Sequence, residues 1–110
     1  MELDVRGRDA ELAQVIASLR DWGVETVYLF GSWARGEEDS LSDIDLVVIR
    51  RTETSFLERF VELSRQLPKQ GRAVDALVYT PEEFAQMREQ GNALVETVLE
   101  EGRIVYARTA

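Results

Sequence analysis

The chain has 110 residues, of which 21 are acidic and 13 are basic, and it contains neither cysteine nor histidine. This length fits one domain with a substantial hydrophobic core, and the missing residue types exclude disulfides, thiolate nucleophiles, the usual zinc sites and a Ser-His-Asp relay. A metal site would therefore need oxygen ligands, which suit hard cations such as magnesium, manganese or calcium.

The formal net charge of -8 argues against a broad surface for nucleic-acid backbones, because such surfaces need clustered lysine and arginine. A basic protein partner, or a nucleotide that arrives with its metal ion, fits this charge better. The longest apolar run, residues 46–49, is far too short to span a bilayer, and residues 1–9 carry no apolar stretch. We expect a cytoplasmic protein without membrane contact, folded as a single domain over residues 1–110.

The first predicted element is an amphipathic helix over residues 9–22. Asp9 is a candidate N-cap, and Gly23 ends the helix. The apolar positions recur at intervals of three and four: Leu12, Val15, Ile16 and Leu19. Residues 24–30 (VETVYLF) are rich in β-branched and aromatic side chains, so they predict the first strand.

A short helix and a second strand follow. Gly31-Ser32 opens the helix, Gly36 ends it, and residues 37–42 form a polar loop. Residues 43–49 (DIDLVVI) alternate at their start and are apolar afterwards, which is typical of a strand covered on both faces.

Three further helices and two strands complete the chain. A helix over residues 56–67 is closed by Pro68, and residues 72–79 (RAVDALVY) form the third strand. Thr80, Pro81 and Glu83 make a capping box that predicts a helix over residues 82–90. A last helix over residues 93–100 ends at Gly102, and residues 103–107 form a final strand. The predicted fold class is α/β (α+β), a small mixed β-sheet covered by helices on at least one face.

The first candidate site is the turn from strand to helix at Gly31-Ser32. Gly31 allows a tight turn and leaves no side chain between the backbone N–H groups and a ligand, while Ser32 adds a hydroxyl at the helix N-terminus. N–H groups and the positive end of the helix dipole attract anions, so a triphosphate would suit this turn. Taken alone, the turn fits better with an ordinary turn glycine and an ordinary N-cap serine.

Asp43 and Asp45 stand at the start of the second strand. Residues two apart in a strand point to the same side, so these carboxylates project together, roughly 6 to 7 Å apart at a rise of ~3.3 Å per residue. Without a cation they repel each other, and with a third group they could clasp two ions about 3.5 to 4 Å apart. A lone Asp-x-Asp more often marks the polar mouth of a strand.

Asp75 is the candidate third acid. It is the only carboxylate inside the third predicted strand, and an ionised group between apolar neighbours is costly unless it is paired or bound to a metal. A salt bridge to Arg72, Arg35 or Lys69 is the alternative explanation.

Two residues near the turn have less certain roles. Arg35 could reach a phosphate, or it could pair with Glu37 or Glu38 at the surface, and the sequence leaves both open. Trp33 is expected to pack against the sheet rather than to flank the entrance of a site. The acidic run over residues 37–39 is expected to be a solvated loop face.

The combination of these residues resembles a known signature. Gly31-Ser32, ten intervening residues and Asp43-x-Asp45, within GSWARGEEDSLSDIDLVVI, resemble the motif of the DNA polymerase β-like nucleotidyltransferase superfamily. The chain looks most like its smallest members, the minimal nucleotidyltransferase (MNT) domains, which are often antitoxins paired with helical HEPN ribonucleases. The resemblance covers essentially the whole chain, and it implies the nucleotidyltransferase fold of the polymerase β-like palm.

The resemblance implies an enzyme that takes a nucleoside triphosphate, usually ATP, and moves the NMP group to a hydroxyl with release of pyrophosphate. Gly31 and Ser32 would hold the β- and γ-phosphates, with Arg35 as a further candidate. Asp43 and Asp45 would bind two magnesium ions, for which manganese could substitute. Asp75 would bind the catalytic ion and help to deprotonate the attacking hydroxyl.

The resemblance also implies a HEPN-type toxin as the acceptor, and the acidic balance of the chain suits a basic partner. Two alternatives stay open: a binding module that neutralises the toxin by covering it, and an adenylyltransferase for a small molecule such as an aminoglycoside. The three acids count against the module. The short length counts against the small-molecule enzyme, because it leaves no room for a second domain that holds the acceptor. The apolar last helix packs internally or against another chain, so a homo-oligomer is a further option.

Overall fold

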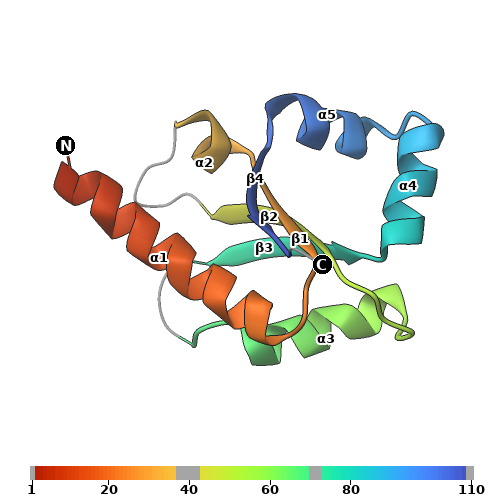
Figure 1. Cartoon of the computed structure of the whole chain (residues 1–110), viewed down its shortest axis with the longest axis horizontal. Coiled ribbons are helices and arrows are strands. Elements are labelled where there is room, and N and C mark those ends of the chain that lie inside the picture. Colours follow the sequence, from red (N-terminus) through yellow and green to blue (C-terminus); the bar gives the residue numbers. More distant parts are fainter. Residues whose placement is uncertain (1, 37–42, 70–72, 109–110) are drawn as a thin grey trace.

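The computed structural model describes residues 2–36, 43–69 and 73–108 (Figure 1). Within these residues, four strands form one sheet in the order β3-β2-β1-β4, in which β1 is antiparallel to β2 and β4 while β2 and β3 are parallel. This arrangement confirms the predicted mixed sheet. The strands are β1 (Thr26–Phe30), β2 (Ile44–Ile49), β3 (Val74–Tyr79) and β4 (Arg103–Ala107).

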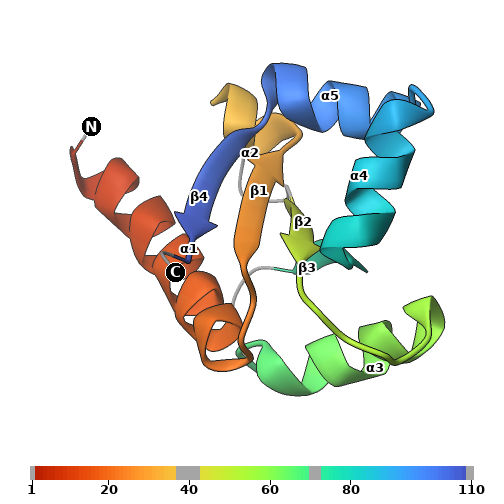
Figure 2. The same cartoon turned by 45° about the vertical axis from the view of Figure 1, so that its right-hand side comes forward.

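Helices cover both faces of the sheet, with α1 and α4 on opposite sides of it (Figure 2). No helix among the residues described is long and apolar enough to cross a membrane. The helices are α1 (Glu2–Asp21), α2 (Ser32–Arg35), α3 (Phe56–Gln66), α4 (Pro81–Glu89) and α5 (Ala93–Glu101).

Strand β2 contributes to the hydrophobic core on both faces of the sheet. Leu46 and Val48 belong to the larger cluster, together with Leu63 of α3, whereas Val47 belongs to a smaller cluster with Val98 of α5. Because successive side chains of a strand point to opposite faces, a strand with helices on both sides is apolar at nearly every position. The prediction of a doubly covered second strand is confirmed.

The first helix begins earlier than predicted. Helix α1 starts at Glu2, so Asp9 is an interior residue of the helix and its prediction as the N-cap was wrong. The regular spacing of apolar residues begins at Leu12. Such a pattern marks only the part of a helix that faces the core, so it does not show that the helix begins earlier. Residues 2–8 are mostly good helix formers, and the one glycine among them costs only about 1 kcal/mol.

The other elements agree with the predictions apart from small differences at their ends. The capping box of α4 is present: Thr80 Oγ1 accepts a hydrogen bond from the Glu83 N–H (3.1 Å), and the Glu83 carboxylate accepts one from the Thr80 N–H (2.9 Å). Pro81 is the first residue of the helix. Thr80 therefore fixes where β3 ends and α4 begins.

Candidate active site

The turn between β1 and α2 has a backbone geometry that requires glycine. Gly31 has φ 74° and ψ -154°, a region that residues with a side chain rarely adopt. A β-carbon built on Gly31 would collide with Oδ2 of Asp45 and would stand 3.2 Å from its Cγ. Both the dihedral angles and the neighbouring carboxylate therefore demand glycine here.

Ser32 is the first residue of α2 and not its N-cap. Gly31 takes the N-cap position, and its carbonyl accepts hydrogen bonds from the N–H groups of Ala34 (3.1 Å) and Arg35 (3.2 Å). No side chain caps this end of the helix. The Ser32 hydroxyl is thus left out of the capping role that the sequence suggested as an alternative to phosphate binding.

Three carboxylates share one face of the sheet. Asp45 is paired with Phe30 on β1 and with Asp75 on β3, and directly paired residues of neighbouring strands point to the same face. Asp43 stands directly before β2, and it lies near the other two acids because its charge raises the pKa of Asp45. This face is the one that α4 and α5 cover, because Val47 follows Asp45 two residues later in the strand. The fold therefore brings the three predicted acids together.

The acids repel one another. The pKa of Asp45 is raised above its ordinary value, first by burial and then by the negative charges of Asp75 and Asp43, and Arg35 offsets only part of this. Among the residues that the structure describes, no three acidic side chains already enclose a point where an ion could sit. Three mutually repelling carboxylates nevertheless form the oxygen-only donor set that a hard divalent cation prefers.

Asp75 is exposed, so the expectation that its apolar neighbours would bury it was wrong. Strand β3 lies at an edge of the sheet, and Ala76 and Val78 point to the core while Asp75 points to the other face. Burial therefore gives no reason to place Asp75 in a site. Its position opposite Asp45 does, and Arg72, one of its suggested partners, lies outside the described residues.

Arg35 has a partner that the sequence did not indicate. Its Nη1 lies 3.5 Å from Oε1 of Glu101, the last residue of α5. Glu37 and Glu38, the partners considered from the sequence, lie outside the described residues. Because Arg35 and Glu101 are far apart in the chain, only the folded arrangement of α2 and α5 reveals the pair.

Trp33 points away from this site. It is buried in the larger hydrophobic cluster, which confirms that it packs against the sheet. Its bulk anchors α2, and with it the turn at Gly31, to the core. The acidic run over residues 37–39 lies in a part of the chain that the structure does not describe.

Comparison with known proteins identifies relatives. A family model described as "Polymerase beta, Nucleotidyltransferase" matches residues 13–110. "Putative protein adenylyltransferase MJ0604" from Methanocaldococcus jannaschii is 31% identical over 84 residues, which cover 76% of this chain and 79% of that protein. The family match includes the turn at Gly31 and the strands β2 and β3.

Solved structures share the fold. The crystal structure of "a putative nucleotidyltransferase from Sulfolobus solfataricus" superposes with a TM-score of 0.64 at 22% identity, covering 94% of this chain and 86% of that one. A structure described as "the toxin-antitoxin with AMP-PNP" gives a TM-score of 0.53 at 19% identity, covering 88% and 73%. At these identities the similarity concerns the fold alone.

Proposed function

Because the chain belongs to the polymerase β nucleotidyltransferase family, we propose that its acidic face transfers AMP from ATP to a hydroxyl group of a partner protein. Family membership makes the chain a nucleotidyltransferase; the donor, the acceptor and the metal are what we propose. One observation carries the proposal. Asp45 of β2 is paired with Asp75 on the neighbouring strand β3, and its carboxylate lies against Gly31 of the turn. The candidate metal ligands and the candidate phosphate cradle are therefore neighbours.

Asp43, Asp45 and Asp75 would hold two magnesium ions, with manganese as a substitute. Bound there, the metal would neutralise charge on the triphosphate and on the phosphorus under attack. The raised pKa of Asp45, caused by burial and by its two acidic neighbours, supports this assignment. Carboxylates that destabilise one another gain most from a cation among them.

Gly31 and Ser32 would bind the β- and γ-phosphates. The backbone of Gly31 carries no side chain that would block a ligand, and the Ser32 hydroxyl is free of a capping role. Arg35, at the other end of the same short helix, would supply a guanidinium for a phosphate oxygen. Its charge lowers the pKa of Asp45, so it acts on the acidic face already without a ligand.

In the proposed reaction, the oxygen of the acceptor hydroxyl forms a bond to the α-phosphorus of ATP. The bond from that phosphorus to the bridging oxygen of the β-phosphate breaks, and pyrophosphate leaves with the electron pair. Asp75 accepts the hydroxyl proton and passes it to solvent. Its exposed position at the start of an edge strand leaves it within reach of an acceptor that comes from outside.

The acceptor that we propose is a HEPN-type toxin, for which this chain would be the antitoxin in the cytoplasm. The relative MJ0604 is named as a protein adenylyltransferase, and a toxin-antitoxin with AMP-PNP has the same fold. AMP-PNP is an analogue of ATP. The net charge of -8 also favours a basic protein as partner.

Transfer of a radioactive label tests this function. The chain is incubated with magnesium, a candidate HEPN toxin and ATP labelled at the α-phosphate, and we expect label on the toxin. ATP labelled at the γ-phosphate should leave the toxin unlabelled, and Asp45→Asn should abolish transfer. Tight binding of the toxin without transfer would favour the binding module instead, and label on an aminoglycoside but not on protein would favour the small-molecule enzyme.

A further inference from the structure

Glu101 contacts the proposed phosphate site without having a role in the proposed reaction. Its Oε1 lies 3.5 Å from Nη1 of Arg35, and the two side chains are 48% and 44% exposed. The pair joins the end of α2 to the end of α5, which lie at the same end of the sheet in both views (Figures 1 and 2). Glu101 is not one of the three acids on the face of the sheet.

Both partners of this ion pair lie in segments next to the end of strand β1. Arg35 belongs to the short helix that starts directly after β1 at Gly31. Glu101 precedes Gly102, at which a β-carbon would stand 3.1 Å from the carbonyl oxygen of Leu29. Arg103, two residues after Glu101, is paired with Leu29 of β1, so both chain segments run close to the end of β1 and the fold itself brings Arg35 and Glu101 together.

A triphosphate would compete with Glu101 for Arg35. The guanidinium of Arg35 already interacts with the carboxylate of Glu101 and, at longer range, with that of Asp45. Phosphate oxygens at Gly31-Ser32 would offer it shorter, charge-assisted hydrogen bonds, which often use two N–H groups at once. The N–H donors that point to Glu101 are not offered to a phosphate, so a phosphate has to compete with Glu101 for them.

We propose that Glu101 is a positioning residue that holds Arg35 in a resting orientation and thereby weakens the binding of ATP. The inference rests on the proposed function, since it assumes a triphosphate at Gly31 and Ser32. When the nucleotide binds, Arg35 turns from Glu101 to the phosphates and the contact between α2 and α5 opens. Glu101 therefore sets the ATP concentration at which the site fills.

Binding of magnesium-ATP to Glu101→Gln tests the proposal. We expect the Kd, measured by calorimetry, and the KM for ATP to fall about 1.5- to 5-fold, the range for a partly exposed ion pair. The kcat of transfer should stay unchanged. In an Arg35→Ala background, Glu101→Gln should no longer alter the Kd for magnesium-ATP, because Glu101 acts on binding only through Arg35.

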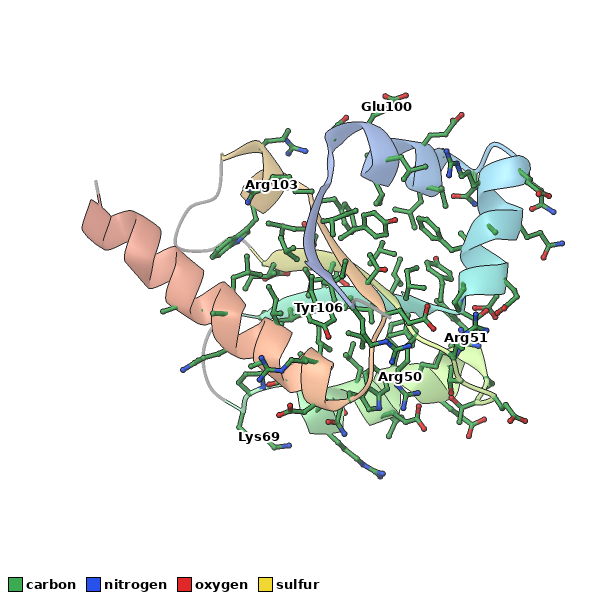
Figure 3. All side chains as sticks on the ribbon, viewed as in Figure 1. Arg50, Arg51, Lys69, Glu100, Arg103 and Tyr106 are labelled. Atoms are coloured by element: carbon green, nitrogen blue, oxygen red, sulfur yellow. The ribbon has the colours of Figure 1, made fainter. Side chains whose placement is uncertain are left out.

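Glu100→Gln is the matched control. Glu100 precedes Glu101 in α5 and points away from the fold into solvent (Figure 3), so this variant removes the same charge without removing the contact. Its Kd for magnesium-ATP should equal that of the wild type. An equal fall in both variants would identify a general charge effect and overturn the proposal.

The Nε–H signal of Arg35 in NMR spectra gives a second measurement. It should differ between wild type and Glu101→Gln without nucleotide and coincide when both are saturated with magnesium-ATP. A Kd that is unchanged or higher in a correctly folded Glu101→Gln contradicts the role of Glu101 and leaves the proposed function intact. If the wild type itself fails to bind magnesium-ATP, the proposed function fails and the role of Glu101 fails with it.

Discussion

Gly31 lies against the carboxylate of Asp45, with no room between them for a methyl group. The contact follows from the sheet, because Phe30, the residue before Gly31, is paired with Asp45 across β1 and β2. The turn that we propose for phosphate binding and the central acid of the proposed metal site are therefore one structural unit. A change at either residue acts on the other.

Gly31→Ala should therefore affect both stability and nucleotide binding. The new methyl group collides with Asp45, and alanine is strained at φ 74°. We expect a loss of about 2–4 kcal/mol in the free energy of unfolding, measured with urea, and no detectable transfer. The same measurement on a second glycine variant helps to separate the collision with Asp45 from the backbone strain.

Gly36→Ala is that control. Gly36 has φ 73° and ψ 23°, and a β-carbon there would meet nothing within 4 Å, so this variant carries a milder backbone strain than Gly31→Ala and no collision. We expect it to lose about 1–2 kcal/mol. Equal losses in the two variants would mean that Asp45 yields easily and that the contact is unimportant.

Asp45→Asn should abolish transfer without destabilising the metal-free protein. The raised pKa of Asp45 means that its charged form is disfavoured in the fold. An uncharged amide removes both the cost of burying that charge and the repulsion from Asp75 and Asp43. Urea unfolding in the presence of EDTA should give an unchanged or higher free energy. A marked loss would show instead that Asp45 is a structural partner of Arg35.

Asp75→Asn should lower the pKa of Asp45. Of the two acidic neighbours that raise this pKa, Asp75 has the larger effect, so its removal makes ionisation of Asp45 easier. A titration of the Asp45 carboxyl carbon by NMR would measure the change, and Asp43→Asn should produce a smaller one. A pKa that does not move would place the Asp75 carboxylate too far from Asp45 to share an ion with it.

The sequence predicted the elements of the fold because their signals are local. Thr80 and Glu83 form a capping box from neighbouring positions, and Gly36 ends α2 with its own left-handed backbone. The apolar run after Asp45 likewise indicated a strand between two layers of helices. Each of these signals acts over a few residues, and no distant part of the chain is needed to recognise it.

The sequence could not predict how distant parts of the chain meet. The pairing of Asp45 with Asp75 depends on the parallel register of β2 and β3, and the contact of Arg35 with Glu101 depends on where α5 ends over the sheet. Asp75 was selected as the only carboxylate among the apolar residues of the third predicted strand, and the family resemblance pointed to the same residue. The expectation of its burial failed because a strand's apolar sequence does not say which strand is at the edge.

Glu83→Ala should destabilise the fold through a buried cation. Arg59 is 5% exposed, and its Nη1 and Nη2 donate hydrogen bonds to the Glu83 carboxylate at 2.7 and 3.1 Å. Removing Glu83 leaves this buried charge without its carboxylate and also removes the capping-box hydrogen bond from the Thr80 N–H, and we expect a total cost of about 2–3 kcal/mol by urea unfolding. Glu82→Ala is the control, because its partner Arg51 is exposed, and it should change little.

The same ion pair gives a pH dependence with a definite sign. Arg59 is the main reason that the pKa of Glu83 is lowered from its ordinary value of 4.5. A carboxyl with a lowered pKa in the folded state stabilises the protein above its ordinary pKa, and that stability is lost as the pH falls through the lowered value. The free energy of unfolding should therefore fall below about pH 4.5, and less steeply in Glu83→Gln. Equal slopes would mean that the pair has no net effect.

Magnesium and ATP together should raise the melting temperature, because a ligand that binds only the folded state stabilises it by mass action. At a concentration 100 times the Kd the gain is about 2.7 kcal/mol, which corresponds to roughly 10–20 °C for a domain of this size. ATP with EDTA should give a much smaller shift, since the triphosphate then meets three carboxylates without a cation. Asp45→Asn should lose most of the shift, whereas Glu100→Gln should keep it. A shift that is equally large with EDTA would mean that the nucleotide binds away from the acids, and the assignment of Asp43, Asp45 and Asp75 as metal ligands would then be wrong.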